Sequence, residues 1–201
     1  MCGIIGVTGE ADAVPVLIGA LHQLEYRGYD SAGIAVVVGA ADGADSDARG
    51  PIWRIRAAGG TNSVAKLADL AAGAPAGHGA AIGHTRWATH GSPTPENAHP
   101  HTDCTRRLAI IHNGIIENHA ELRAELEAAG HTLTSATDTE VMAHLIEQEM
   151  AGGAPLAEAT RTMLRRLRGA FSIAVVSADE PDTIVAARRL TPLVLGLHDD
   201  V

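Results

Sequence analysis

Short apolar runs of strand length recur along the whole chain and alternate with stretches of helical periodicity. Eight of these runs, rich in aliphatic residues, predict strands over 3–7, 34–38, 52–57, 80–84, 108–112, 172–176, 183–187 and 193–197. Apolar residues recur at intervals of three and four over 14–24, 119–129, 141–146 and 156–167, which predicts amphipathic helices. So many strands imply a large sheet at the core of the molecule.

The length of 201 residues favours a single domain, because it supports one sizeable core and is short for two. Hydrophobic residues make up 46% of the chain and charged residues 19%, which is the balance of a folded protein. Two polar, glycine-rich stretches, 39–51 and 71–79, are connectors between the predicted elements. We expect one domain over residues 1–201.

Charge and composition argue against two classes of partner. The net charge is -9, and the only aromatic residues are two tryptophans, two tyrosines and one phenylalanine. Such a chain repels a phosphate backbone and offers little surface for bases to stack on. No apolar stretch approaches the roughly 18 residues of a membrane span, and no basic and apolar leader is present. We expect a cytoplasmic protein that binds neither nucleic acid nor membranes.

Five segments are too polar or too glycine-rich for the strands that they adjoin. They read MCGIIG (1–6), LEYRGYDSAGIA (24–35), GHTRWATHG (83–91), HNGIIEN (112–118) and SATDTE (135–140). Apart from the first, which opens the chain, each lies at the end of a predicted strand or the start of a predicted helix. Loops held by a rigid scaffold are where binding and catalytic groups tend to lie.

Together and in this order, the five segments resemble the glutaminase domain of the glutamine-fructose-6-phosphate aminotransferases, also called glucosamine-6-phosphate synthases. The resemblance implies a class II glutamine amidotransferase with the N-terminal-nucleophile hydrolase fold. That α+β fold is a four-layer αββα sandwich, in which two stacked antiparallel sheets lie between two layers of helices. The implied reaction is hydrolysis of L-glutamine to glutamate and ammonia, and full-length family members use the ammonia to convert fructose 6-phosphate to glucosamine 6-phosphate.

Cys2 would become the N-terminal residue if Met1 were removed. A thiol attacks a carboxamide as the thiolate, yet the pKa of a free cysteine is about 8.5. The terminal amine, with an ordinary pKa of about 7.7 to 8.0, would accept the thiol proton through water. The resemblance therefore makes Cys2 the nucleophile of a thioester mechanism, although alone it would be read as a small apolar residue that starts a strand.

Attack on an amide produces a tetrahedral oxyanion, which needs donors already aimed at it. The side-chain amide of Asn113 is such a donor, and Gly114 lacks a Cβ, so its backbone N–H can approach closely. The resemblance implies that both residues form the oxyanion hole. Without that context, an Asn-Gly pair is also a common tight turn between strands.

Glutamine carries an α-carboxylate and an α-ammonium, and the resemblance assigns them to Arg86 and Asp138. Arginine holds a carboxylate with two parallel N–H bonds. Thr89 and His90 add donors from the segment 86–94, which closes over the substrate. Thr137 with Glu140 three residues later predicts a capping box, which places Asp138 near a helix start. Isolated residues of these types are more often a surface charge and a favourable partner of the helix dipole.

Three more residues resemble parts of the family site. Arg27 and Gly28 in YRGYDSAG resemble residues that line the pocket of the nucleophile. Trp87 would belong to the closing segment or to the passage for ammonia. The alternative for Trp87 is simple packing against the surface of the domain.

The sequence predicts no metal and no cofactor. Eleven histidines occur, and five of them cluster in the sequence: His84, His90, His99, His101 and His112. No spacing among them matches a zinc signature with cysteines. Cys104 lies in a polar stretch and is interpreted as a nonessential thiol, and a secreted disulfide scaffold would carry more than two cysteines.

Other classes of protein remain alternatives. Amidophosphoribosyltransferases, asparagine synthetases and glutamate synthases share the glutaminase class, but HTRWATHG and HNGIIEN are closer to the hexosamine enzymes than to the HxRYST and HNGN of the purine enzyme. A binding or regulatory module without the chemistry is disfavoured because every catalytic residue type is present. A redox or metal protein is disfavoured by the number and spacing of the cysteines.

The sequence also departs from the family pattern near its end. Nothing of the sugar-isomerase region, with its two similar modules, is present in the 201 residues, and LTPLV stands where a serine-proline pair is usual. We expect an excised domain that is truncated at its C-terminal end, in preference to a natural stand-alone domain. Its full-length form would be a homodimer, and the missing synthase region would be the part that uses the ammonia.

Overall fold

The structure is a computed structural model that describes residues 2–9, 12–38, 52–60, 62–75, 79–87 and 91–197. Strands, α-helices and one 3-10 helix alternate along these residues. They follow one another as β1 (Gly3–Val7), α1 (Ala13–Leu24), the 3-10 helix (Glu25–Arg27), β2 (Ser31–Val37), β3 (Ile52–Ala58), α2 (Ser63–Ala71), β4 (Ala81–Arg86), β5 (His101–Thr102), β6 (Leu108–Ile116), α3 (His119–Ala128), α4 (Glu140–Ala151), α5 (Leu156–Arg166), β7 (Gly169–Ser177) and β8 (Glu180–Arg189).

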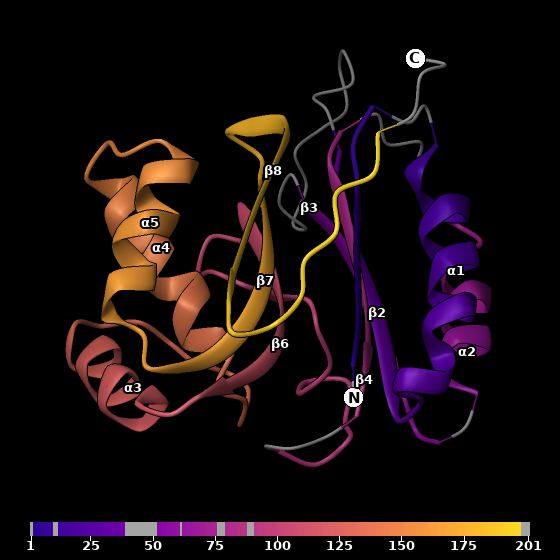
Figure 1. The fold of residues 1–201 in the computed structure, drawn as a ribbon, viewed down its shortest axis with the longest axis horizontal. Coiled ribbons are helices and arrows are strands. Elements are labelled where there is room, and N and C mark those ends of the chain that lie inside the picture. The colour runs from indigo at the N-terminus through magenta and orange to yellow at the C-terminus, as the bar shows by residue number, and fades with distance from the viewer. Residues whose placement is uncertain are drawn as a thin grey trace.

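Two antiparallel sheets of four strands stack face to face (Figure 1). The first sheet has the strand order β1-β4-β2-β3 and the second has the order β5-β6-β7-β8. Helices α1 and α2 cover the outer face of the first sheet, and α3, α4 and α5 lie on the outer side of the second (Figure 1). This is the four-layer αββα sandwich of the α+β class, so the predicted fold is confirmed.

Three apolar clusters hold the four layers together. One joins α1 and α2 to the first sheet, and a second joins α3, α4 and α5 to the second sheet. The third cluster fills the space between the sheets and contains several small residues, namely Ala35, Ala80, Ala109 and Ala174. Strands β1 and β4 contact β6 across this inter-sheet layer, which therefore sets the position of β6 relative to the N-terminus of β1.

Most predicted elements are confirmed, although their ends shift by a few residues. Seven of the eight predicted strands and all four predicted helices are present. The sequence analysis did not predict β5, which has only two residues, or α2, in which Val64, Leu67 and Ala71 face the first sheet. No helix in the described ranges is long and apolar enough to cross a membrane. The predicted connector 39–51 lies outside the described residues.

The strand predicted over 193–197 is wrong. Strand β8 ends at Arg189, and Leu190 then has a φ of 63°, a left-handed conformation that turns the chain away from the sheet. Residues 193–197 form no strand, and Leu195 and Leu197 are 84% and 88% exposed. An apolar run forms a strand only where a neighbouring strand completes its hydrogen bonds, and this segment has none in the described sheets.

The predicted capping box at the start of α4 is also wrong. The helix begins at Glu140, and its N-cap is Thr139, which makes no side-chain capping bond. The Glu140 carboxylate instead accepts the backbone N–H of Ser135 at 2.6 Å, and the Thr137 hydroxyl bonds with that of Ser135 at 2.9 Å. Glu140 thus holds the loop before the helix in place, and Asp138 does lie near the helix N-terminus.

Candidate active site

Cys2 immediately precedes β1 and lies beside the end of β4. Its Sγ accepts a hydrogen bond from the backbone N–H of Trp87 at 3.2 Å. Burial of the side chain raises the pKa of the Cys2 thiol, and the Trp87 N–H opposes that shift because it favours the thiolate. A thiol with a raised pKa needs a nearby base before it can act as a nucleophile.

Gly28 lets the chain pass close to the peptide that holds this thiol. A Cβ built on Gly28 would lie 2.7 Å from the carbonyl carbon of Arg86 and 2.9 Å from the nitrogen of Trp87. These distances are shorter than any normal contact, so a side chain there would displace the peptide whose N–H reaches Cys2. Glycine is required here by close approach, because its φ of -174° is ordinary extended backbone.

Asn113 comes from β6 of the second sheet and contacts Cys2. Its Nδ2 donates to the Cys2 carbonyl oxygen at 3.0 Å, and its Oδ1 lies 3.0 Å from Nε2 of His84. The same His84 nitrogen lies 3.0 Å from the backbone oxygen of His112. Since both partners of Nε2 are acceptors, Nε2 carries the hydrogen and donates it. The Asn113 amide therefore has one orientation, and the second hydrogen of Nδ2 can be donated to a substrate.

His84 is a site residue that the sequence reasoning weighed only as part of a histidine cluster. It is fully buried in β4, and burial lowers the pKa of His84 to about 3. The ring is therefore neutral at physiological pH and keeps its hydrogen on Nε2, where it orients Asn113. The sequence did contain an indication that His84 belongs to the site. His84 lies two residues before Arg86 in GHTRWATHG, and alternate residues of a strand share one face.

Gly114 has a φ of 133° inside β6, at the point where the strand passes β7. A Cβ on Gly114 would lie 2.1 Å from the backbone oxygen of Ala170, so no other residue fits without moving a strand. Because both Asn113 and Gly114 lie within the continuous strand β6, the alternative of a simple Asn-Gly turn is wrong. The two predicted oxyanion donors thus lie side by side on β6, and Asn113 contacts Cys2.

Arg86 and Asp138 are both buried, with 3% and 5% exposure, and their charges are close enough to interact. Arg86 donates to the backbone oxygens of Gly91 and Ser92 at 3.2 and 3.4 Å. Oδ2 of Asp138 accepts the backbone N–H of Ile116 at 2.8 Å. Arg86 also interacts electrostatically with Cys2, and a buried cation beside a buried anion suits a ligand that carries both charges.

The remaining predicted site residues differ in how far the structure describes them. Nε of Arg27 donates to the Cys2 carbonyl oxygen at 3.2 Å, so Arg27 helps to fix the position of Cys2. The Trp87 side chain is half exposed and packs edge to face on Tyr29, with ring centroids 5.4 Å apart. Thr89 and His90 lie outside the described residues, and their roles stay predictions.

Asn97 links two of the polar segments and was missed by the sequence analysis. Its Nδ2 donates to the backbone oxygen of Ser92 at 3.0 Å, and its Oδ1 accepts the backbone N–H of Ala136 at 2.8 Å. Asn97 therefore fastens the chain beside Arg86 to the loop that carries Asp138. Nothing in its local pattern, NAHPH, distinguishes this role from an ordinary turn asparagine.

Four of the five clustered histidines pack against one another between the sheets. The rings of His84 and His99 lie 4.1 Å apart, and those of His99 and His101 lie 4.9 Å apart. Nε2 of His99 and Nδ1 of His112 both contact the Thr139 hydroxyl, at 2.8 and 2.9 Å. Within the described ranges these histidines form no convergent set of metal ligands. They are buried structural groups that support the strands of the site.

The arrangement around Cys2 suits acyl transfer. A side-chain amide donor with a fixed orientation contacts the residue that carries the thiol, and a buried cation lies within electrostatic range of both Cys2 and the buried Asp138. Nucleophilic attack on a carbonyl carbon needs the first two features, and recognition of an amino acid needs the last two.

Comparisons with known proteins agree with this geometry. The pattern of a family described as "Glutamine amidotransferase domain" matches residues 84–200. Glutamine--fructose-6-phosphate aminotransferase [isomerizing] of Symbiobacterium thermophilum is 51% identical over 199 residues, and that of Escherichia coli is 47% identical over 197 residues. Each match covers nearly all of this chain, 99% and 98%, and 30% of the relative. The chain thus spans about a third or less of the curated relatives that it matches.

Solved structures give the same fold. Glutamine phosphoribosylpyrophosphate amidotransferase from B. subtilis superimposes with a TM-score of 0.77 at 26% sequence identity, over 100% of this chain and 40% of that one. A structure described as the allosteric regulatory enzyme of purine biosynthesis has a TM-score of 0.70 at 28% identity, over 89% of this chain and 36% of that one. Both solved structures therefore share the sandwich described here.

Proposed function

The chain belongs to the glutamine amidotransferase domain family, and from this membership we propose that it hydrolyses the side-chain amide of L-glutamine to glutamate and ammonia. One observation carries the proposal. The Cys2 thiol accepts a hydrogen bond from the Trp87 N–H, and the Asn113 amide, which comes from the other sheet, donates to the backbone oxygen of Cys2. A nucleophile and an oxyanion donor are thereby held together by two separate sheets.

In the first step, Sγ of Cys2 attacks the amide carbon of glutamine. The thiol proton passes to the free amine of Cys2, through water, once Met1 has been removed. The carbonyl oxygen becomes an oxyanion, which accepts hydrogen bonds from Nδ2 of Asn113 and the backbone N–H of Gly114. Each donor that is already in place removes roughly 3 to 4 kcal/mol from the barrier.

In the second step, the tetrahedral intermediate collapses to a thioester and ammonia leaves with the proton that the amine returns. Water, deprotonated by the same amine, then attacks the thioester carbon and releases glutamate from Cys2. The same two donors stabilise the second oxyanion, so one site serves both halves of the reaction.

Recognition of the amino acid rests on Arg86 and Asp138. We assign the α-carboxylate of glutamine to Arg86 and its α-ammonium to Asp138, because the two side chains are buried and opposite in charge. Thr89 and His90, on the segment after β4, would complete the pocket as the chain closes over the substrate. Asn97 supports both sides of that pocket.

The destination of the ammonia is a separate part of the proposal. The relatives are named glutamine--fructose-6-phosphate aminotransferases, and the chain covers 30% of the Symbiobacterium protein. We propose that the ammonia converts fructose 6-phosphate to glucosamine 6-phosphate in the synthase region of such a full-length enzyme. A cytoplasmic homodimer is the proposed form of that enzyme.

Glutamate release from glutamine by this chain, with Met1 removed, tests the hydrolysis directly. The wild type should release glutamate and ammonia in equal amounts and make no amino sugar from fructose 6-phosphate. The Cys2→Ala variant should bind glutamine and release nothing, while acid quenching of the wild type should trap a glutamyl thioester detectable by mass. Equal rates for wild type and Cys2→Ala would refute the proposal.

A further inference from the structure

A second group of reactive side chains lies outside the site described above, at the junction of α4 with the loops before β6 and after α3. We propose that Cys104, His131, His144 and Glu147 bind one Zn²⁺ ion. The proposal does not depend on glutamine hydrolysis, and it assigns a structural role to a cysteine that the sequence analysis interpreted as nonessential. The prediction that no metal is bound was based on spacing among other histidines.

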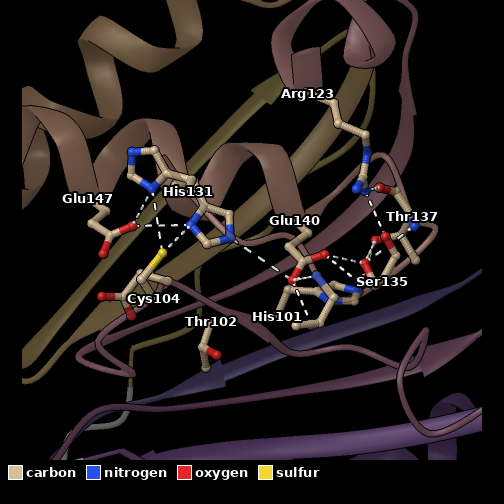
Figure 2. Close-up of polar contacts among 12 residues, drawn as sticks. His101, Thr102, Cys104, Arg123, His131, Ser135, Thr137, Glu140 and Glu147 are labelled. Carbon is tan, nitrogen blue, oxygen red and sulfur yellow. Dashed lines mark hydrogen bonds and ion pairs between the residues drawn. The ribbon is translucent and has the colours of Figure 1, made fainter. Parts of the chain in front are cut away.

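Cys104, His131 and Glu147 point toward one another in Figure 2, and a ring nitrogen of His144 lies in the same cluster. Sγ of Cys104 lies 3.5 Å from Nδ1 of His131 and 3.4 Å from Nδ1 of His144. Oε2 of Glu147 lies 3.0 Å from the first of these nitrogens and 3.1 Å from the second. One sulfur, two imidazole nitrogens and one carboxylate oxygen thus lie within 4.8 Å of one another.

These separations are close to those around a tetrahedral zinc ion. With a zinc–sulfur bond of about 2.3 Å and zinc–nitrogen bonds of about 2.0 to 2.1 Å, tetrahedral angles place sulfur and nitrogen ligands about 3.6 Å apart. Nitrogen and oxygen ligands would lie about 3.4 Å apart. The four distances given above are shorter than these values by only a few tenths of an ångström, so a small movement of the side chains would admit the ion.

The backbone holds Cys104 in place before any ligand arrives. Its neighbour Asp103 accepts the backbone N–H of Thr105 at 3.2 Å and that of Leu108 at 2.9 Å. The Arg106 N–H bonds back to the Asp103 carbonyl oxygen, which closes a turn around Cys104. Asp103 is buried while Cys104 is exposed, so the turn presents the thiol at the surface, where an ion can enter.

His131 is positioned by the end of α3. Gly130 has a φ of 93°, and the backbone N–H groups of Gly130 and His131 bond to the oxygens of Glu127 and Leu126. This pair of bonds is the Schellman motif, which fixes the direction of the chain after a helix. His131 therefore occupies a defined position rather than a variable one in the loop.

His144 and Glu147 are three residues apart on α4, so they share one face of the helix. His144 is buried, and its Nε2, which has no hydrogen-bond partner, faces Oε1 of Glu140 at 4.0 Å. A carboxylate behind a histidine is the usual second partner of a metal-bound imidazole. Glu140 also holds Ser135, so the proposed ion would brace the loop that carries Asp138 (Figure 2).

The chemistry of the four ligands favours zinc over a hard cation. Calcium and magnesium prefer sets of oxygen ligands, whereas this set has one thiolate, two imidazoles and one carboxylate. All four tetrahedral positions come from the protein, which is typical of a structural site rather than a catalytic one. The competing explanation is a cluster of hydrogen bonds in which both imidazoles donate to Glu147.

Metal titration distinguishes zinc binding from a hydrogen-bonded cluster. Chelator-treated chain should bind one equivalent of Zn²⁺, measured by elemental analysis after dialysis. Titration with Co²⁺ as a probe should produce a thiolate-to-cobalt charge-transfer band and the intense visible bands of a tetrahedral ion. Binding well below one equivalent, or a cobalt spectrum without the thiolate band, would overturn the proposal.

Two variants and one control identify the ligands. Cys104→Ser should abolish the charge-transfer band and weaken Zn²⁺ binding by about 100-fold or more, and His131→Asn should weaken binding by at least about 10-fold. Cys2→Ser removes the other thiol and should leave the spectrum and the affinity unchanged. Circular dichroism verifies that each variant is folded, and the exposed positions of Cys104 and its turn favour that outcome. An unaltered cobalt spectrum in Cys104→Ser would refute the assignment.

Discussion

At the scale of single residues, the orientation of the Asn113 amide is set by the neutral ring of His84. The ring donates from Nε2 to Oδ1 of Asn113, which turns Nδ2 toward Cys2. A fully buried residue thereby controls the proposed oxyanion donor. His84 is a positioning residue, and its contribution depends on a single N–H at the right place.

Replacement of His84 tests this dependence. Glutamine can place an amide N–H near the position of Nε2, so His84→Gln should keep kcat within about tenfold of the wild type. His84→Leu removes the donor and should lower kcat by about 100-fold, the usual cost of one misplaced oxyanion donor, with little change in KM. Steady-state kinetics of glutamate release measure both values. Equal losses in the two variants would indicate that the volume of the ring matters and its N–H does not.

Gly28 offers a second residue-level prediction. Its Cβ would lie 2.7 Å from the carbonyl carbon of Arg86, so Gly28→Ala should push the Trp87 N–H away from Cys2 and cost about 1 to 3 kcal/mol of stability. The rate of glutamate release should fall as well. Gly19→Ala is the matched control, because nothing lies within 4 Å of a Cβ there and alanine favours helix α1 by up to about 1 kcal/mol. Urea denaturation and kinetics of both variants measure the difference.

The base proposed for Cys2 exists only after removal of Met1. An amide-linked Cys2 has no free amine, so activity should follow the fraction of chains that begin at Cys2. Intact mass and glutaminase rate, measured on matched preparations with and without methionine removal, determine this relation. Full turnover by chains that retain Met1 would exclude the amine and make His90 the first alternative base to test.

At the scale of elements, β4 and the segment that enters β5 contribute a layer of buried histidines. Burial lowers the pKa of His84 to about 3 and holds those of His99 and His101 well below the ordinary 6.5. In the unfolded chain these groups take up protons as the pH falls below about 6.5, while in the folded chain they do not. Above that pH these histidines therefore do not lower the free energy of unfolding, and they lower it progressively as the pH falls toward 3.

The pH dependence of unfolding should show this uptake. Each histidine makes the free energy of unfolding fall by about 1.4 kcal/mol per pH unit within that window. Urea denaturation at pH 7, 6 and 5 measures the slope for the wild type. In the His84→Gln variant this slope should be smaller, by up to the contribution of one proton. An identical slope in the two proteins would contradict the assignment of His84 as a neutral buried group.

The elements of the sandwich could be predicted where periodicity was strong. Runs such as 3–7 and 108–112 carry their own signal, because each is a short, continuous aliphatic run of strand length. Strand β5 has two residues, too few for any period, and the run 193–197 has the right residues without a neighbouring strand. Whether such a segment forms a strand depends on its tertiary contacts, which cannot be read from the sequence of that segment alone.

The candidate site was predictable to a similar degree. Cys2, Arg86, Asn113 and Asp138 follow from motifs in which each residue type has a chemical reason to be present. The roles of His84 and Asn97 depend on which strand end meets which loop, so they become visible only in the folded chain. The same is true of Cys104, whose partners come from α4 and from the loop after α3.

At the scale of the whole molecule, the candidate site is divided between two sheets. Arg86 lies in the first sheet and Cys2 immediately precedes its strand β1, while Asn113 and Gly114 belong to the second sheet. Their separation depends on the inter-sheet layer, where Ala109 is fully buried on β6. A shift of the reacting groups by about 1 Å can lower the reaction rate by about 100-fold. The inter-sheet layer therefore affects the rate although its residues do not contact the substrate.

A larger side chain in the inter-sheet layer should therefore lower the rate. Ala109→Val adds volume between the sheets and should cost about 1 to 3 kcal/mol of stability, with a fall in kcat greater than the change in KM. Ala186→Val on β8 adds the same volume at an exposed position and should be nearly neutral in both measurements. A normal kcat in a destabilised Ala109→Val protein would show that the spacing of the sheets is not limiting.

The small residues of the inter-sheet layer also constrain how sequences with this fold diverge. A substitution that enlarges a side chain on one sheet is tolerated when a facing residue on the other sheet becomes smaller, because the total volume and the spacing are then preserved. Positions such as Ala35 and Ala109 should therefore change in pairs during evolution, although they lie on different sheets and far apart in the chain. Covariation between the sheets would then record selection on the distance between the proposed nucleophile and the proposed oxyanion donor, through residues that do not contact the substrate.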